Sequence, residues 1–132
     1  HDLIPYRQAK ELGIPRAFLR DLEDVYGMPK GWKFHPHLVK DGVYYIHIGG
    51  SGMNASMNKA KQMSMSTVCG HTHRYGGVIY FSNPKQLFFG LNTGCLLDKE
   101  AYAMRYNNTE PTLGCGVVCS STEAYFIPMK LK

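Results

Sequence analysis

The sequence predicts a mixed α/β fold of the α+β kind, a layered β-sandwich flanked by helices. Apolar residues recur at helical spacing over the first third of the chain, and short apolar runs separated by turn residues fill most of the rest. Helices followed by strands are typical of this class. Apolar residues make up 44% of the 132 residues and charged residues 19%, which predicts one globular domain over residues 1–132 with a core of its own.

Two helices are expected in the first third of the chain. Residues 6–12 favour a helix that ends at Gly13, and Pro15 suits the first position of the next helix. The apolar residues of that second helix recur at spacings of three and four, which predicts a single apolar stripe. They are Phe18, Leu19, Leu22, Val25 and Tyr26. Gly27 and Pro29 end the helix.

The rest of the chain is predicted to consist mainly of strands. Asp41-Gly42 is a strong turn signal between two runs of strand residues, 34–40 and 43–48. A glycine-rich loop leads into a helix over residues 54–63, where Met53, Met57 and Met63 are expected to pack in the core. The remaining elements are a strand at 66–69, a loop at 70–77, paired strands at 78–81 and 87–91, a short helix or strand at 97–104, and a final hairpin of 117–119 and 124–127.

Charge and cysteine content limit the partners and the compartment. The formal net charge of +5 permits an anionic partner, although the basic residues are scattered along the chain. No apolar run approaches the ~20 residues that cross a bilayer, so no membrane association is expected. The cysteines form no C-x-x-C pair, which predicts buried free thiols in a cytoplasmic protein. They are Cys69, Cys95, Cys115 and Cys119.

Three histidines at the ends of predicted strands are the candidate metal ligands. His71 and His73 are separated by one residue at the exit of a strand, and Gly70 allows a tight turn just before them. His47 ends another apolar strand and opens into the glycine-rich loop. A lone histidine at such a position is most often a core residue, but three of them at strand exits indicate a shared metal site.

Other polar positions have simpler interpretations. His35 and His37 flank Pro36 on an expected edge strand and are predicted to be exposed. Arg74 follows the histidine pair and is either a ligand for a substrate phosphate or a surface arginine. The glycines of residues 49–52 lack the G-K-[ST] ending of a P-loop, which excludes a nucleotide-phosphate loop there.

The order of these features resembles the second half of the calcineurin-like metallophosphoesterases, above all their small single-domain bacterial and phage members. That family's signature runs D-x-H, G-D-x-x-D, G-N-H-D/E, a lone histidine, then G-H-x-H. Residues 70–73, Gly-His-Thr-His, match the last block, and His47 matches the lone histidine. His1-Asp2 matches the end of G-N-H-D, and residues 91–96 resemble the asparagine- and glycine-containing segment that follows.

The resemblance implies hydrolysis of phosphate mono- or diesters through two divalent metal ions (Mn, Fe, Zn or Ni). His47 and His71 resemble ligands of one ion, and His73 resembles a ligand of the other. His1 matches the catalytic histidine that contacts the phosphate and assists the leaving group, and Asp2 matches the acidic neighbour that orients it. The substrate would be a phosphate ester, and the positive charge favours a nucleotide or nucleic acid.

The carboxylate-bearing motifs of that signature are absent from the sequence. There is no D-x-H and no G-D-x-x-D. Two dications held roughly 3.5–4 Å apart repel each other unless anionic ligands neutralise them. We therefore expect this chain to be the C-terminal portion of a single metallophosphoesterase-like domain, inactive without an N-terminal segment.

Two alternative functions are open at this point. The first is a catalytically silent binding module of the same fold. The second is a copper site in which an N-terminal His1 chelates the ion through its amine and its ring, with His47 or His71 completing the ligand set.

Overall fold

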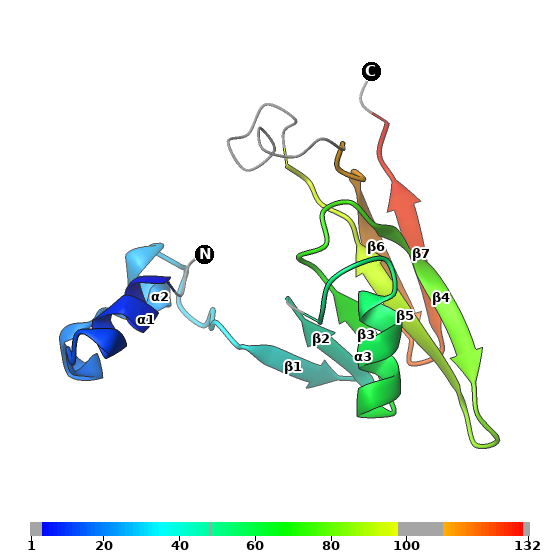
Figure 1. Cartoon of the computed structure of the whole chain (residues 1–132), viewed down its shortest axis with the longest axis horizontal. Helices are drawn as coiled ribbons and strands as arrows, with labels where there is room; N and C mark the ends of the chain where they lie inside the picture. The colour runs from blue at the N-terminus through cyan, green and yellow to red at the C-terminus, as the bar shows by residue number, and fades with distance from the viewer. Residues whose placement is uncertain (1–3, 48, 98–109, 131–132) are drawn as a thin grey trace. The chain divides into compact units, whose positions relative to one another are not determined.

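The structure, a computed structural model, describes residues 4–47, 49–97 and 110–130. The chain divides into two compact units, His1–His35 and Pro36–Lys132, each considered by itself. Figure 1 labels their helices and strands. Over the described residues, no helix has both the length and the apolar character needed to cross a membrane.

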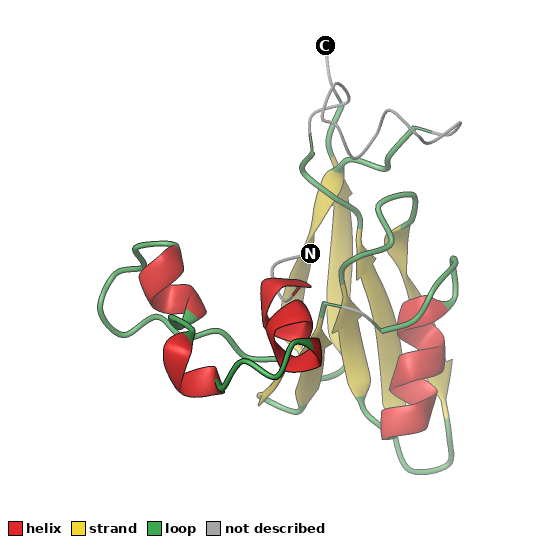
Figure 2. Cartoon of the chain, turned by 60° about the vertical axis from the view of Figure 1, so that its left-hand side comes forward, coloured by secondary structure: helices red, strands yellow, loops and turns green. Residues whose placement is uncertain are grey.

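The first unit contains three short helical elements, shown as helices and turns in Figure 2. They are α1 (Ile4–Glu11), the 3-10 helix η1 (Arg16–Phe18) and α2 (Leu22–Val25). The first predicted helix is confirmed, and Gly13 ends it with a left-handed φ of 69°. The prediction of one continuous second helix is wrong, because extended backbone at Leu19 and Asp21 separates η1 from α2.

Arg16 explains the break in the second helix. Its guanidinium donates to the carbonyl oxygen of Leu19 at 2.8 Å and forms an ion pair with the Asp21 carboxylate. The Arg16 side chain therefore provides the Leu19 carbonyl oxygen with the hydrogen bond that a backbone amide would provide in a continuous helix. The predicted apolar stripe is only partly buried, because Leu19 and Leu22 are half-buried whereas Phe18 is 77% and Val25 54% exposed. Among the described residues of this unit, only Ala9 is buried.

The second unit contains a five-stranded mixed sheet and a two-stranded sheet (Figure 1), which confirms the mixed α/β class. Its elements are β1 (His37–Lys40), β2 (Val43–Ile46), α3 (Ala55–Met63), β3 (Ser66–Cys69), β4 (Gly76–Ser82), β5 (Leu87–Thr93), β6 (Gly114–Ser120) and β7 (Glu123–Pro128). The large sheet has the order β1-β2-β3-β5-β4. Strands β2, β3 and β5 are parallel, and the outer two are antiparallel to their neighbours.

Most of the predicted elements in this unit are confirmed. Asp41 and Gly42 have left-handed φ values of 50° and 75°, as a two-residue hairpin turn requires. The predicted helix forms α3, which connects the parallel strands β2 and β3 as a crossover. The predicted element at 97–104 lies outside the described residues from position 98 onward.

Neighbouring residues of β5 show that different elements pack on the two faces of the large sheet. A Cβ atom on Gly90 would lie 2.4 Å from the backbone nitrogen of Met57, so α3 lies directly against that face. Adjacent residues of a strand point to opposite faces. Leu91 accordingly faces β6, where a Cβ on Gly116 would lie 2.6 Å from its side chain. The unit is thus layered as helix, five-stranded sheet and two-stranded sheet.

The core lies between the two sheets. Its fully buried members are Val43, Phe89, Leu91 and Ala124, and Tyr45, Val68, Val78, Val118 and Phe126 pack around them. Hydroxyl groups also connect the sheets. The Ser66 hydroxyl donates to the Ser121 carbonyl oxygen at 2.5 Å and accepts from the Phe89 amide, and the Tyr80 hydroxyl donates to the Ala124 carbonyl oxygen at 2.7 Å.

Two predictions about burial need correction. Met53 and Met63 are exposed rather than in the core, because the small residues Ala55, Ser56 and Ala60 form the buried face of α3. The cysteines are free as predicted, and Cys69 is buried, but Cys115 and Cys119 are exposed. These two are four positions apart on β6, so the strand places both on its outer face with Val117.

Candidate functional site

Three imidazoles meet at the carboxyl ends of two neighbouring parallel strands. His47 directly follows β2, and His71 and His73 follow β3. The strands end level, with Ile46 opposite Cys69. Ring centroids are 5.4 Å apart for His47 and His71, and 6.5 Å apart for His71 and His73. The structure therefore brings together all three histidines predicted as metal ligands, at the sheet edge where parallel strands commonly present ligands.

A tight turn after β3 aims these side chains. His71 has a left-handed φ of 68°, uncommon for a residue with a Cβ. The Thr72 amide donates to the Gly70 carbonyl oxygen at 2.8 Å, and the His73 amide donates to the His71 carbonyl oxygen at 2.9 Å. A Cβ on Gly70 would lie 3.3 Å from His47 Nδ1, so the absence of a side chain there lets the two strand ends approach. Uncommon backbone of this kind is concentrated at functional sites.

Buried residues at the ends of β3 and β5 pack beside the histidines. Gly49 lies against Cys69 so closely that a Cβ on it would be 2.1 Å from the sulfur. Burial raises the pKa of the Cys69 thiol to about 11. Cys69 is fully buried against Gly49, so its described role is packing. The Asn92 side-chain amide donates to the Met53 carbonyl oxygen at 2.7 Å and holds the glycine-rich loop against the end of β5.

The ring separations can be compared with metal geometry. Two imidazoles on one tetrahedral ion, with metal–nitrogen distances of ~2.0–2.1 Å, place their ring centroids about 5 Å apart. The 5.4 Å between His47 and His71 fits a shared ion, and the 6.5 Å between His71 and His73 fits ligands of adjacent ions better. Within the described ranges, no group of three or more His, Cys, Asp or Glu side chains is arranged to hold a metal ion. The described side chains therefore supply three neighbouring imidazoles but no complete metal site.

A pocket of about 300 Å³ opens beside His71 and His73. Its lining consists of Ser51, Gly52, His71, Thr72, His73, Arg74 and Tyr75. Within the described part of the chain, no acidic residue is among them. The Thr72 hydroxyl is buried and has no hydrogen-bond partner among the described residues. A buried polar group left in that state costs about 1–3 kcal/mol unless a ligand or solvent satisfies it.

Sequence reasoning missed most of this pocket. The sequence indicates Arg74 as a candidate phosphate ligand, but it gives no signal for Thr72 or Tyr75, although Thr72 lies between the two histidines. The loop that contains Ser51 is predicted not to bind a nucleotide phosphate, yet Ser51 and Gly52 line this pocket. His35 and His37 are exposed, as predicted. His1 and Asp2 lie outside the described residues, so the predicted catalytic pair has no position here.

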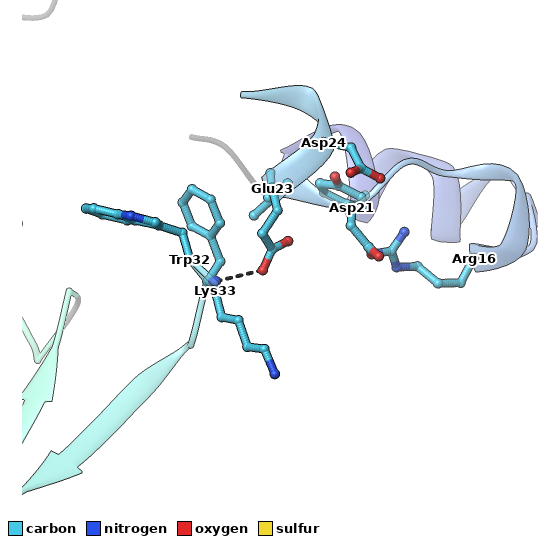
Figure 3. A pocket seen from close by; sticks show the side chains of 9 residues that line it. Arg16, Asp21, Glu23, Asp24, Trp32 and Lys33 are labelled. Carbon is cyan, nitrogen blue, oxygen red and sulfur yellow. Dashed lines mark hydrogen bonds and ion pairs between the residues drawn. The ribbon is translucent and has the colours of Figure 1, made fainter. Parts of the chain in front are cut away.

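A larger cavity, of about 570 Å³, lies in the first unit (Figure 3). It is lined by Tyr6, Arg16, Asp21, Leu22, Glu23, Asp24, Trp32, Lys33 and Phe34. The Phe34 amide donates to the Glu23 carboxylate at 2.8 Å, and this bond lowers the pKa of Glu23. Arg16 is paired with Asp21. Arg16, Asp21 and Glu23 are thus satisfied within the unit, and the histidine-lined pocket is the stronger candidate despite its smaller volume.

The chain matches no protein-family model, no curated protein and no solved structure. Functional inference therefore depends on the geometry and chemistry of the residues themselves.

Proposed function

We propose that this protein is a metal-dependent phosphoesterase of the calcineurin-like metallophosphoesterase type, which hydrolyses phosphate mono- or diesters. The observation that supports the proposal is the convergence of His47, His71 and His73 at the ends of two parallel strands joined by α3. A layered arrangement of a mixed sheet, a second sheet and a flanking helix is in keeping with that fold.

Each imidazole has a separate task in the proposed site. His47 and His71 would hold one divalent ion, and His73 would hold the second. When bound, the ions would neutralise charge on the phosphoryl group and lower the pKa of water. His1 would donate a proton to the leaving oxygen, and Asp2 would orient the His1 ring.

A site made of these three imidazoles also requires anionic ligands. Imidazoles are neutral as ligands, so three of them leave the repulsion between two dications uncompensated. The described residues that line the pocket contribute no carboxylate. We therefore propose that anionic ligands from outside the described pocket lining complete the site.

The proposal is tested on the full-length gene product with aryl phosphate mono- and diesters. Manganese is expected to stimulate hydrolysis. His71→Ala is expected to lower kcat/KM by roughly 100-fold or more, because the substitution removes a proposed ligand of the metal ion. His37→Ala is the matched control, because His37 is an exposed histidine of the same unit that stacks on Tyr44. Absence of metal-stimulated hydrolysis, or undiminished activity in His71→Ala, would reject the assignment.

Among the described residues that line the pocket none is acidic, and this favours one second candidate, a catalytically silent binding module of the same fold. Metal analysis of the full-length product separates the two. The phosphoesterase is expected to retain about two equivalents of manganese or zinc per chain after dialysis. The silent module is expected to retain none, and His71→Ala would then leave the metal content unchanged.

A further inference from the structure

The pocket beside the histidines is lined by hydroxyl groups, imidazoles and a guanidinium. We propose that Ser51, Thr72, Arg74 and Tyr75 bind a second anionic group, carried by the leaving group of the phosphoester. The substrate class is thus a small phosphoester whose leaving group bears its own phosphate or carboxylate. The substrate class rests on the proposed function, whereas the binding of an anion in this pocket does not.

The chemistry of the lining supports this assignment. Ser51, Thr72 and Tyr75 contribute hydroxyl groups, and Arg74 contributes a guanidinium; among the described residues that line the pocket there is no carboxylate. A guanidinium donates two parallel hydrogen bonds to a phosphate or carboxylate, which gives it geometric selectivity as well as charge. Hydroxyl groups supply further donors to the same oxygens.

Thr72 supplies an independent observation. The residue is only 9% exposed, lines the pocket, and has a hydroxyl without a hydrogen-bond partner among the described residues. Buried polar groups are nearly always hydrogen-bonded, so such a group indicates that a partner belongs there. Because Thr72 lies between His71 and His73, an acceptor that reaches its hydroxyl is held next to the imidazoles.

The nine-residue helix α3 adds to the positive character of the pocket. Ser51 and Gly52 belong to the loop that leads into its first residue, Ala55. Asn54, at the N-cap position, makes no side-chain capping hydrogen bond. The N-terminus of a helix carries partial positive charge and amide donors, which favour an anion near this loop.

The pocket size favours a small ligand. About 300 Å³ lies at the lower end of the roughly 300–1,000 Å³ typical of small-molecule sites. A leaving group with one additional charged group, such as a nucleotide or a sugar phosphate, is of suitable size. Of the two substrates expected from the sequence, a nucleotide or a nucleic acid, the pocket size favours the small molecule.

The anion site is tested first on this chain without metal. The chain is titrated with inorganic phosphate and, separately, with acetate at constant ionic strength, and the Thr72 and Arg74 amides are followed by NMR. Saturable shifts with either anion are expected, and the tighter anion identifies the group as phosphate or carboxylate. Thr72→Val and Arg74→Ala are each expected to weaken binding by about tenfold, and Thr72→Ser is expected to restore it.

Lys85→Ala is the matched control for charge, because Lys85 is an exposed cation of the same unit in the turn between β4 and β5. It is expected to bind the anion as the unchanged chain does. Shifts that do not saturate, or an equal loss in Arg74→Ala and Lys85→Ala, would overturn the anion site, since either result means diffuse charge attraction.

The substrate class is tested on the full-length product. The ratio of kcat/KM for a nucleoside bisphosphate to that for an aryl phosphate is expected to fall at least about tenfold in Arg74→Ala and to stay unchanged in Lys85→Ala. An unchanged ratio in Arg74→Ala overturns the substrate assignment. Failure of all hydrolysis would instead reject the proposed phosphoesterase, and the anion titration of the isolated chain would remain a separate result.

Discussion

Glu23 shows how one backbone contact fixes a charged side chain. Its carboxylate accepts a hydrogen bond from the Phe34 amide, and this bond lowers the pKa of Glu23 below its ordinary value of 4.5. Donation of N–H groups to a carboxylate stabilises its charged form. Because the folded-state pKa is depressed, the resulting stabilisation is present above pH 4.5 and is lost as the pH falls through the folded-state pKa.

We expect the Phe34 amide to report this titration directly. As Glu23 takes up a proton, the hydrogen bond weakens and the amide chemical shift moves, with a midpoint below pH 4.5. A series of NMR spectra from neutral to acidic pH measures the midpoint. In Glu23→Gln the Phe34 amide is expected to lose this titration, and a midpoint at or above pH 4.5 in the unchanged chain would contradict the assigned contact.

The residues of the candidate site differ in how far sequence could predict them. The meeting of His47 with His71 follows from two strand exits and one connecting helix, because parallel neighbours end at the same edge of a sheet. The left-handed backbone of His71 has no such signal, since its residue type gives only a weak preference for that region. The buried hydroxyl of Thr72 depends on that turn, so it could be found only in the structure.

At the scale of elements, local signals sufficed where tertiary packing agreed with them. The strand β3 has its predicted position and is largely buried. The hairpin at Asp41-Gly42 is exposed and forms because both residues adopt the left-handed φ that the turn requires. The second helix of the first unit is broken because hydrogen bonds from Arg16 replace helical ones. Burial also adds little stability to a continuous apolar stripe there, since Phe18 and Val25 are exposed. Periodicity alone predicts a stripe but not whether another element covers it.

The contact between α3 and β5 predicts a difference between two glycine substitutions. In Gly90→Ala the new methyl group would lie 2.4 Å from backbone of α3, which can yield only if the whole helix moves. In Gly116→Ala the nearest atom, at 2.6 Å, is the end of the Leu91 side chain, which can rotate. We expect Gly90→Ala to lower the free energy of unfolding by about 1–3 kcal/mol, and Gly116→Ala to lower it by less.

Urea denaturation of the two variants and the unchanged chain measures this difference. Both variants make the same chemical change on a strand of the same unit, so they differ mainly in what the methyl group meets. Each also reduces the entropy of the unfolded chain to the same degree, which cancels in the comparison. An equal or greater loss in Gly116→Ala would mean that α3 does not lie against β5 as described.

At the scale of the whole molecule, the two units differ in their means of stability. The second unit has a continuous core between its sheets and hydroxyl links from Ser66 and Tyr80 across them. The first unit buries only Ala9 among its described residues and leaves several large apolar side chains exposed. Chains below about 40 residues rarely fold without a disulfide, a metal or a partner.

This contrast predicts that the second unit folds alone and the first does not. A polypeptide of residues 36–132 is expected to unfold cooperatively in urea, because the described core and the site histidines all belong to Pro36–Lys132. A polypeptide of residues 1–35 is expected to show the NMR spectrum of a disordered chain. The 36–132 polypeptide should also bind phosphate as the full chain does, since every residue lining the anion pocket is retained. Loss of cooperative unfolding in residues 36–132 would show that the first unit is required for the fold.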